Sequence, residues 1–200
     1  MEDTKGGNRL VKQHLNQLVY HSISIRFIIA TIALLASYLP CFDSSANVLL
    51  PNESSSLLKR WIYTSLRWDA FHFLHIAQEG YQFEYEWAFL PGMPVVLRAT
   101  GWIFDHAFTG DVASPRTYNM LLGHFLVSSV MSCETIRTIY LLTIEHTQQP
   151  ALSLLSGYLY LLSSSPATAH LAPYAEPWFA FFSYKGKEYL SRNGATMVST

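Results

Sequence analysis

The stretch HSISIRFIIATIALLASYLPCF, residues 21–42, decides the fold class of this chain of 200 residues. Its last 16 residues, 27–42, carry no charge. With the residues before them, the apolar segment reaches the roughly 20 residues that a helix needs to cross a bilayer core. Arg26 lies near the start, where an arginine can extend to the lipid headgroups. The sequence therefore predicts a first transmembrane span at 22–42.

Basic residues gather on one side of this segment. Those that precede it are Lys5, Arg9 and Lys12, whereas Asp43 follows it and no base occurs before Lys59. The positive-inside rule then predicts a cytosolic N-terminus, 1–21, with residues 43–86 across the membrane. An acceptor sequon for N-glycosylation at Asn52 agrees with this orientation. A cleaved signal peptide is the alternative, but its charged leader would be about 25 residues long and its cleavage pattern is weak.

The composition favours a membrane protein over a soluble one. Half of the residues are apolar and only 14% are charged, against roughly 25% in an average soluble chain. A net charge of −1 provides no basic field for binding nucleic acid. Cys41 and Cys133 give neither a disulfide framework nor zinc spacing, and we expect free, buried thiols. We expect an all-α polytopic membrane protein.

Further membrane segments are expected over 87–184, followed by a polar C-terminal tail at 185–200. Pro91, Gly92 and Pro94 interrupt the start of the first apolar piece, so this entrance should be buried in protein. Glu134 and Arg137 have the spacing of a helical ion pair. The bases after residue 184 predict that this end of the chain is cytosolic. If every apolar segment crosses the membrane once, the number of crossings predicts the opposite side. One piece must be re-entrant or too short to cross, and the sequence leaves open which one.

The segment RWDAFHFLHIAQEGY, residues 67–81, predicts an amphipathic helix at the membrane interface. At 100° per residue, its polar side chains fall within about 120° of one another; they are Asp69, His72, His75 and Glu79. Gly80 is a suitable C-terminal stop. An acid in the first turn of a helix has a purely structural explanation. The histidines would suit a solvated face, and their spacing is a weak signal for metal binding.

Aromatic residues surround these acids, namely Trp68, Tyr81, Tyr85, Trp87 and Phe89. Flat rings beside carboxylates are typical of sugar sites, because C–H faces stack on the rings while hydroxyls bond to the acids. An aromatic belt at the membrane interface is the structural alternative.

The longer stretch RWDAFHFLHIAQEGYQFEYEWAFLPGMPVVL, residues 67–97, resembles the first lumenal region of the GPI mannosyltransferase 2 (PIG-V-like) family. The matching residues are Trp68, Asp69, Ala70, His72, Phe73, Ile76, Ala77, Gly80, Tyr81, Ala88, Phe89, Pro91, Gly92 and Pro94. SPATAHLAPYAEPWFAFFS, residues 165–183, is similar to the second marker of the family through Ser165, Pro166, Ala167, Tyr174, Glu176, Phe179 and Ala180. Pro173 and Ala175 depart from the usual glycine and serine, and Asn119 is a looser match.

The resemblance implies a GT-C-like transmembrane helix bundle whose lumenal loop, 43–86, carries the interfacial helix. It implies transfer of the second mannose, in α-1,6 linkage, from dolichyl-phosphate mannose to the GPI intermediate at the lumenal face of the endoplasmic reticulum. Asp69 would be the catalytic base. The expected substrate-binding residues are Trp68, His72, Tyr81, Phe89, Pro91, Tyr174 and Glu176. No bound cofactor or metal is expected; the partners would be membrane lipids, the GPI-precursor glycolipid and a small accessory membrane subunit, with no nucleic acid.

The resemblance covers only the N-terminal portion of a longer family, so we expect a truncated copy or fragment. The alternatives to an active transferase are an inactive pseudoenzyme and a non-catalytic membrane subunit of the endoplasmic reticulum. Another GT-C mannosyltransferase is a further alternative, although such enzymes lack the long tryptophan–aspartate pattern. A transporter is disfavoured because no internal repeat is visible.

Overall fold

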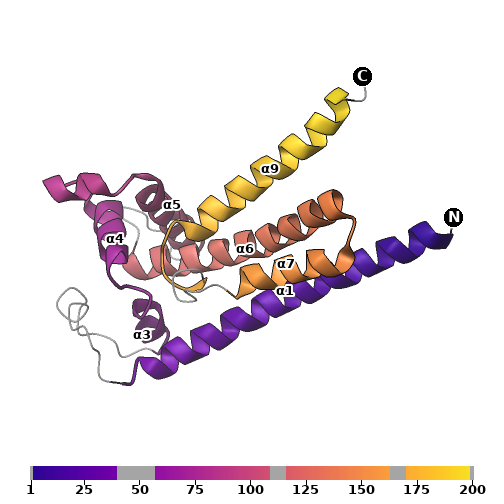
Figure 1. Ribbon diagram of the computed structural model, residues 1–200. Helices are drawn as coiled ribbons and strands as arrows, with labels where there is room; N and C mark the ends of the chain where they lie inside the picture. The colour runs from indigo at the N-terminus through magenta and orange to yellow at the C-terminus, as the bar shows by residue number, and fades with distance from the viewer. Residues whose placement is uncertain (1, 40–56, 109–115, 163–169, 199–200) are drawn as a thin grey trace. The chain divides into compact units, whose positions relative to one another are not determined.

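The computed structural model describes residues 2–39, 57–108, 116–162 and 170–198, and every regular element in these ranges is helical. The expectation of an all-α protein is therefore confirmed for the part of the chain described (Figure 1). The chain divides into two compact units. Cys41, the sequon at Asn52 and the marker residues Ser165, Pro166 and Ala167 lie outside the described residues.

The first unit comprises Met1–Arg26, Ser129–Ser164 and Glu176–Thr200. It contains the first part of α1 (Glu2–Ala36), the second part of α6 (Thr117–Thr147), α7 (Pro150–Leu161) and α9 (Glu176–Val198). Its core joins three of these helices through Leu18, Ile136, Tyr140 and Leu161. The fully buried Leu18 makes α1 a constituent of this core.

α1 runs antiparallel to α6 within this unit. His14 Nδ1 lies 3.1 Å from the hydroxyl of Tyr140, whereas Arg26 Nη2 donates to Ser132 Oγ at 2.6 Å. Arg26 is only 4% exposed, and its Nη1 also donates to Ser129 Oγ at 3.2 Å. The arginine therefore does not extend to the headgroups, because serines one turn apart on α6 accept its hydrogen bonds.

α9 runs parallel to α6. Lys185 Nζ lies 3.8 Å from Glu134 near the start of this pairing, and Ser191 Oγ donates to Glu145 at 2.7 Å near its end. The predicted ion pair between Glu134 and Arg137 is confirmed at 3.1 Å. The N-terminal part of α1 and the C-terminal parts of α6 and α9 consequently share one end of the unit, so Arg9, Lys12 and Arg192 lie toward this end.

The second unit comprises Phe27–Ser128 and Ser165–Ala175. Besides parts of α1 and α6, it holds α3 (Leu57–Tyr63), α4 (Asp69–Glu79), the short 3₁₀ helix η1 (Glu84–Ala88) and α5 (Gly92–Phe108). The buried Asp105 joins α5 to α6, accepting hydrogen bonds from the backbone N–H of Arg116 at 2.7 Å and from Asn119 Nδ2 at 2.6 Å. α4 packs on α5 and has four buried residues, Ala70, Leu74, Ile76 and Ala77.

Within the part of the chain that the structure describes, two helices are long and apolar enough to cross a membrane, Gly7–Ala36 with 30 residues and Thr117–Thr147 with 31. The first of these begins well before the span expected at 22–42 and ends at Ala36. α5 and α7, with 17 and 12 residues, fall short of the roughly 20 residues that a perpendicular crossing requires. The two candidate helices support the assignment to a membrane protein.

Candidate functional site

The chain enters α4 through a strained turn at Trp68. The φ and ψ angles of Trp68 are 48° and −124°, which are those of the first central residue of a type II′ turn, a position that glycine dominates. The carbonyl of Arg67 accepts a hydrogen bond from the N–H of Ala70 at 3.1 Å and closes this turn. A non-glycine residue in such a conformation costs about 1–3 kcal/mol, and such strain concentrates at functional sites.

Asp69 follows this turn as the first residue of α4. Trp68 occupies the N-cap position and makes no side-chain capping bond. Asp69 is exposed, and no described residue donates a hydrogen bond to its carboxylate. Capping of the helix start therefore does not account for this acid, although a carboxylate in the first turn does interact favourably with the helix dipole. The strained turn presents an open carboxylate beside an exposed indole.

Tyr174, which belongs to the second sequence marker, contacts residues of the first marker. Its hydroxyl donates to the carbonyl of Arg67 at 3.3 Å, across 107 residues of sequence. Its ring also meets Phe73 of α4 edge to face, with centroids 6.3 Å apart. The carbonyl that closes the turn before Asp69 therefore also receives the Tyr174 hydroxyl, which couples the two markers at the backbone of the candidate site.

His72 and the aromatic residues of 81–89 form one ring cluster beside α4. The His72 ring stacks on Phe89 with centroids 4.6 Å apart and meets Tyr85 edge to face at 5.6 Å. Tyr81 stacks on Trp87 at 4.6 Å and donates its hydroxyl to the carbonyl of Phe89 at 2.6 Å. Three of the residues predicted to bind substrate, His72, Tyr81 and Phe89, thus lie in one cluster.

A buried carboxylate fastens this aromatic segment to α4. Glu86 is 1% exposed, and its Oε1 lies 2.5 Å from His75 Nδ1. Its Oε2 accepts the backbone N–H groups of Gln82 at 2.7 Å and Phe83 at 3.0 Å. Sequence reasoning placed His75 on a solvated face and missed this clamp. The available signal was an acid three residues after the N-cap residue Phe83, the spacing of a capping box.

Pro91 and Glu176 are two predicted site residues that are not members of this cluster. Pro91 is exposed, and its carbonyl accepts the N–H of Val95 at 3.0 Å as α5 begins. Glu176 is exposed in the first turn of α9 and belongs to the first unit. Among the residues with defined positions, no three His, Cys, Asp or Glu side chains are grouped to hold a metal ion.

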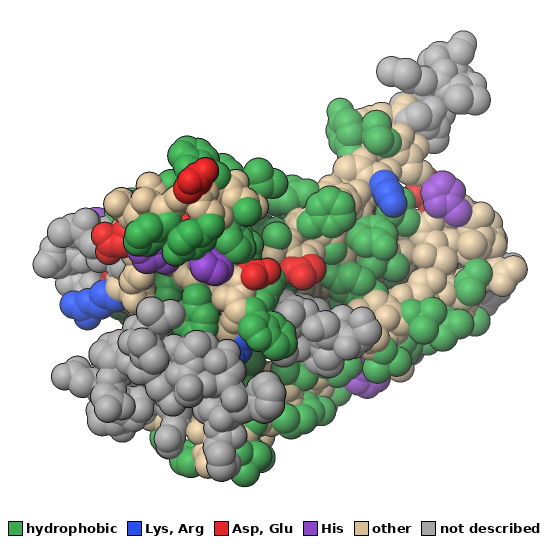
Figure 2. Space-filling model, turned by 60° about the vertical axis from the view of Figure 1, so that its left-hand side comes forward, with side chains coloured by type: hydrophobic (Ala, Val, Ile, Leu, Met, Phe, Trp, Pro, Cys, Tyr) green, Lys and Arg blue, Asp and Glu red, His purple; other side chains and the backbone are tan. Residues whose placement is uncertain are grey.

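Large apolar side chains are exposed around the cluster. Trp68 is 71% exposed and Trp87 is 70% exposed, and Phe83, Tyr85 and Leu90 are also exposed. Figure 2 shows acidic and histidine side chains among hydrophobic ones over the part of the molecule that contains α4. The combination of exposed rings and an open carboxylate suits a ligand that has both apolar faces and hydroxyl groups, as a sugar does.

Residues 13–199 match the family model described as mannosyltransferase (PIG-V). A GPI mannosyltransferase 2 of Cryptococcus neoformans var. neoformans serotype D is 32% identical over 157 residues, which cover 78% of this chain and 34% of the relative. The GPI mannosyltransferase 2 of Gibberella zeae has the same identity and coverage. The GPI alpha-1,6-mannosyltransferase 2 of Mus musculus is 32% identical over 147 residues, 72% of this chain and 29% of the relative.

The chain thus spans about a third of the length of the curated relatives that it matches. No solved structure matches it.

Proposed function

Because the chain belongs to the mannosyltransferase (PIG-V) family, we propose that its α4 region carries the acidic site at which mannose is transferred to a GPI-anchor precursor. The observation that carries the proposal is the open carboxylate of Asp69 on the strained turn at Trp68. The rings next to it offer stacking faces for the sugars of the two substrates. The acceptor is then the GPI glycolipid, with the transferred residue as its second mannose in α-1,6 linkage.

The proposed donor is dolichyl-phosphate mannose. Since its mannose is β-linked, an α-linked product requires inversion, and so a single displacement at the anomeric carbon. Asp69 would accept the proton of the attacking hydroxyl, the role of a general base. The departing lipid phosphate needs charge compensation more than protonation. His72, one helical turn after Asp69, or an arginine would provide it.

Both substrates are lipids, which is the reason for an exposed aromatic surface near the acid. Indole and phenol rings are favoured at membrane interfaces, so Trp68, Tyr85 and Trp87 would hold α4 at the depth of the sugar headgroups. We place this surface on the lumenal face of the endoplasmic reticulum membrane, within a GT-C-like bundle of several spans. We also propose a small accessory membrane subunit as a partner of this chain.

The test uses a chimera in which residues 1–200 replace the matching segment of the mouse relative, expressed in cells that lack the second GPI mannosyltransferase. In a chimera that restores transfer, Asp69→Asn should reduce it by about 10²-fold or more, because an amide cannot take a proton. Glu79→Gln is the matched control, since Glu79 is an exposed acid on the same helix. The measurement is the ratio of one-mannose to two-mannose GPI intermediates at equal protein level.

Near-normal two-mannose product from Asp69→Asn would remove Asp69 from the mechanism. Equal losses from Asp69→Asn and Glu79→Gln would contradict a specific role. The 200-residue chain alone should not restore transfer, because it spans only about a third of the relatives' length. Rescue by this chain alone would show that the catalytic cavity needs no further spans.

A further inference from the structure

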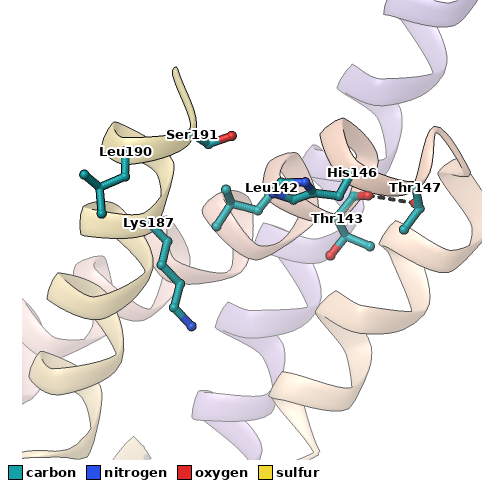
Figure 3. A pocket seen from close by; sticks show the side chains of 7 residues that line it. All are labelled: Leu142, Thr143, His146, Thr147, Lys187, Leu190 and Ser191. Atoms are coloured by element: carbon teal, nitrogen blue, oxygen red, sulfur yellow. Dashed lines mark hydrogen bonds between the residues drawn. The ribbon is translucent and has the colours of Figure 1, made fainter. Parts of the chain in front are cut away.

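A second candidate site lies in the first unit, between the C-terminal parts of α6 and α9. It is an open pocket of about 650 Å³ with a mostly apolar surface, lined by Leu142, Thr143, His146, Thr147, Lys187, Leu190 and Ser191. In Figure 3 the ring of His146 extends from α6 toward α9, and the side chain of Lys187 extends from α9 into the space between the two helices. The pocket takes no part in the proposed transfer reaction, and its ligand can be tested independently of that reaction.

Lys187 differs from the other bases of α9. Lys185 Nζ lies 3.0 Å from Glu188 and Arg192 Nη2 lies 2.6 Å from the same carboxylate. The ammonium group of Lys187 instead lies 5.4 Å from the centre of the Tyr184 ring, and no described carboxylate is within 4.0 Å of it. The positive charge that faces the pocket is therefore not neutralised by an ion pair among the described residues.

His146 adds a second nitrogen donor in the last turn of α6. Two acids are next to lining residues in sequence. Glu145 accepts a hydrogen bond from the lining residue Ser191 at 2.7 Å, and Glu188 pairs with Lys185 and Arg192. The two leucines provide an apolar wall. A lysine, a histidine and an apolar wall at the end of a candidate membrane helix suit a ligand that has an anionic head and an apolar tail.

The end of the unit at which the pocket lies carries further bases. Because α1 is antiparallel to α6, the exposed Arg9 and Lys12 belong to this same end. The positive-inside rule assigns this end to the cytosolic face, and cytosolic leaflets carry the anionic lipids that attract such basic residues.

The geometry points to a phosphate-binding pocket for the head group of an anionic lipid. Lys187 Nζ and the ring N–H of His146 donate to the phosphate oxygens, while Leu142 and Leu190 contact the first carbons of the acyl chains. Free phosphate has the same head-group chemistry and is the other possible source of the ligand.

The test is lipid retention by the complete 200-residue chain, measured by native mass spectrometry from micelles that contain phosphatidic acid and phosphatidylcholine. Lys187→Gln should reduce the apparent affinity for phosphatidic acid about fivefold, the worth of one lysine at an anionic surface. Lys187→Arg should retain most of that affinity because it keeps the charge. Lys12→Gln is the control, since it removes an equal charge from an exposed position at the same end.

Two results would contradict the proposed phosphate-binding pocket. One is unchanged retention of phosphatidic acid by both Lys187→Gln and His146→Gln, and the other is an equal loss from Lys12→Gln. Competition by inorganic phosphate distinguishes the two sources of the ligand. Displacement of phosphatidic acid by millimolar phosphate supports a pocket that recognises the phosphate group alone. Resistance to displacement supports a pocket that also binds the apolar part of the lipid.

Discussion

His75 and Glu86 form the shortest polar contact at the candidate site, with Nδ1 of His75 2.5 Å from Oε1 of Glu86. The contact joins the middle of α4 to η1. Burial tends to raise the pKa of the Glu86 carboxyl, but the N–H groups of Phe83 and Gln82 and the ring of His75 together outweigh it. The pKa of Glu86 therefore lies below its ordinary value. The clamp holds in one place the two segments that provide His72 and the rings stacked against it.

The first prediction concerns the pH dependence of this clamp. Because the pKa of Glu86 is lowered by folding, its stabilising contribution should be fully present above the ordinary value of 4.5. It should be lost as the pH falls through the lower pKa of the folded chain. The difference in melting temperature between the natural chain and Glu86→Gln should then shrink as the pH falls below 4.5. Thermal unfolding in detergent micelles across this range provides the measurement.

Glu84→Gln is the control for this experiment, because Glu84 is exposed on the same short helix. Its melting temperature should follow that of the natural chain at every pH. A difference between Glu86→Gln and the natural chain that stays constant down to the lowest pH would contradict the lowered pKa.

The second prediction concerns the close approach of α5 and α6. A Cβ atom added at Gly123 would lie 2.9 Å from Thr100 Cβ and 3.0 Å from the Thr100 carbonyl oxygen. Backbone atoms cannot move aside cheaply, so Gly123→Ala should lower the free energy of unfolding by about 1–3 kcal/mol. Gly186→Ala on α9, where nothing lies within 4 Å, should raise it by roughly 0.5–1 kcal/mol. Equal melting temperatures for the two variants would argue against the close approach.

The third prediction concerns Arg26 within the first unit. Ser132 is 2% exposed and accepts the 2.6 Å hydrogen bond from Arg26. Ser132→Ala should cost about 1–3 kcal/mol, because a buried charged donor loses an acceptor. Ser156→Ala should stay within about 0.5 kcal/mol, since the Ser156 hydroxyl donates only to a carbonyl of its own helix at an exposed position. Indistinguishable unfolding curves for the two alanine variants would exclude Ser132 as a significant partner of Arg26.

Local signals in the sequence predicted α4 well. The apolar spacing and Gly80 predicted a helix that begins with Asp69 in its first turn and stops before the glycine. The structure has α4 at Asp69–Glu79, followed by Gly80 with a φ of 79°. These features depend only on neighbouring residues, because a helical period and a glycine at the C-terminus are read within a single segment.

Features that depend on distant residues could not be predicted in the same way. The position of Arg26 is set by Ser132, 106 residues away, and nothing near Arg26 identifies this partner. The capping-box spacing of Glu86 indicates the start of η1, but the contact with His75 also requires η1 to fold back on α4, which that spacing does not reveal. The positive φ of Trp68 runs against the preference of a bulky residue, so local propensity predicts the opposite.

The last prediction distinguishes the effect of the backbone strain at Trp68 from the effect of its side chain. Trp68→Gly would relieve a backbone strain of about 1–3 kcal/mol, whereas glycine ordinarily costs about 0.5–1 kcal/mol in chain entropy. The indole is 71% exposed, so its removal forfeits little burial. Strain relief is the larger effect, so Trp68→Gly should unfold at the same or a higher temperature than the natural chain. Trp68→Ala keeps the strain and is the matched comparison.

In the chimera with the mouse relative, both variants should lower mannose transfer, because each removes the ring beside Asp69. Trp68→Phe should retain more activity than either, since it keeps an aromatic face at the turn. A melting temperature of Trp68→Gly below that of Trp68→Ala, by the ordinary cost of glycine, would mean that the turn stores no strain. Transfer that stays normal in Trp68→Gly at normal protein level would limit the indole to anchoring the turn at the membrane interface. Higher stability together with lower transfer is the expected result, because a strained turn that holds the proposed catalytic base trades stability for the position of that base.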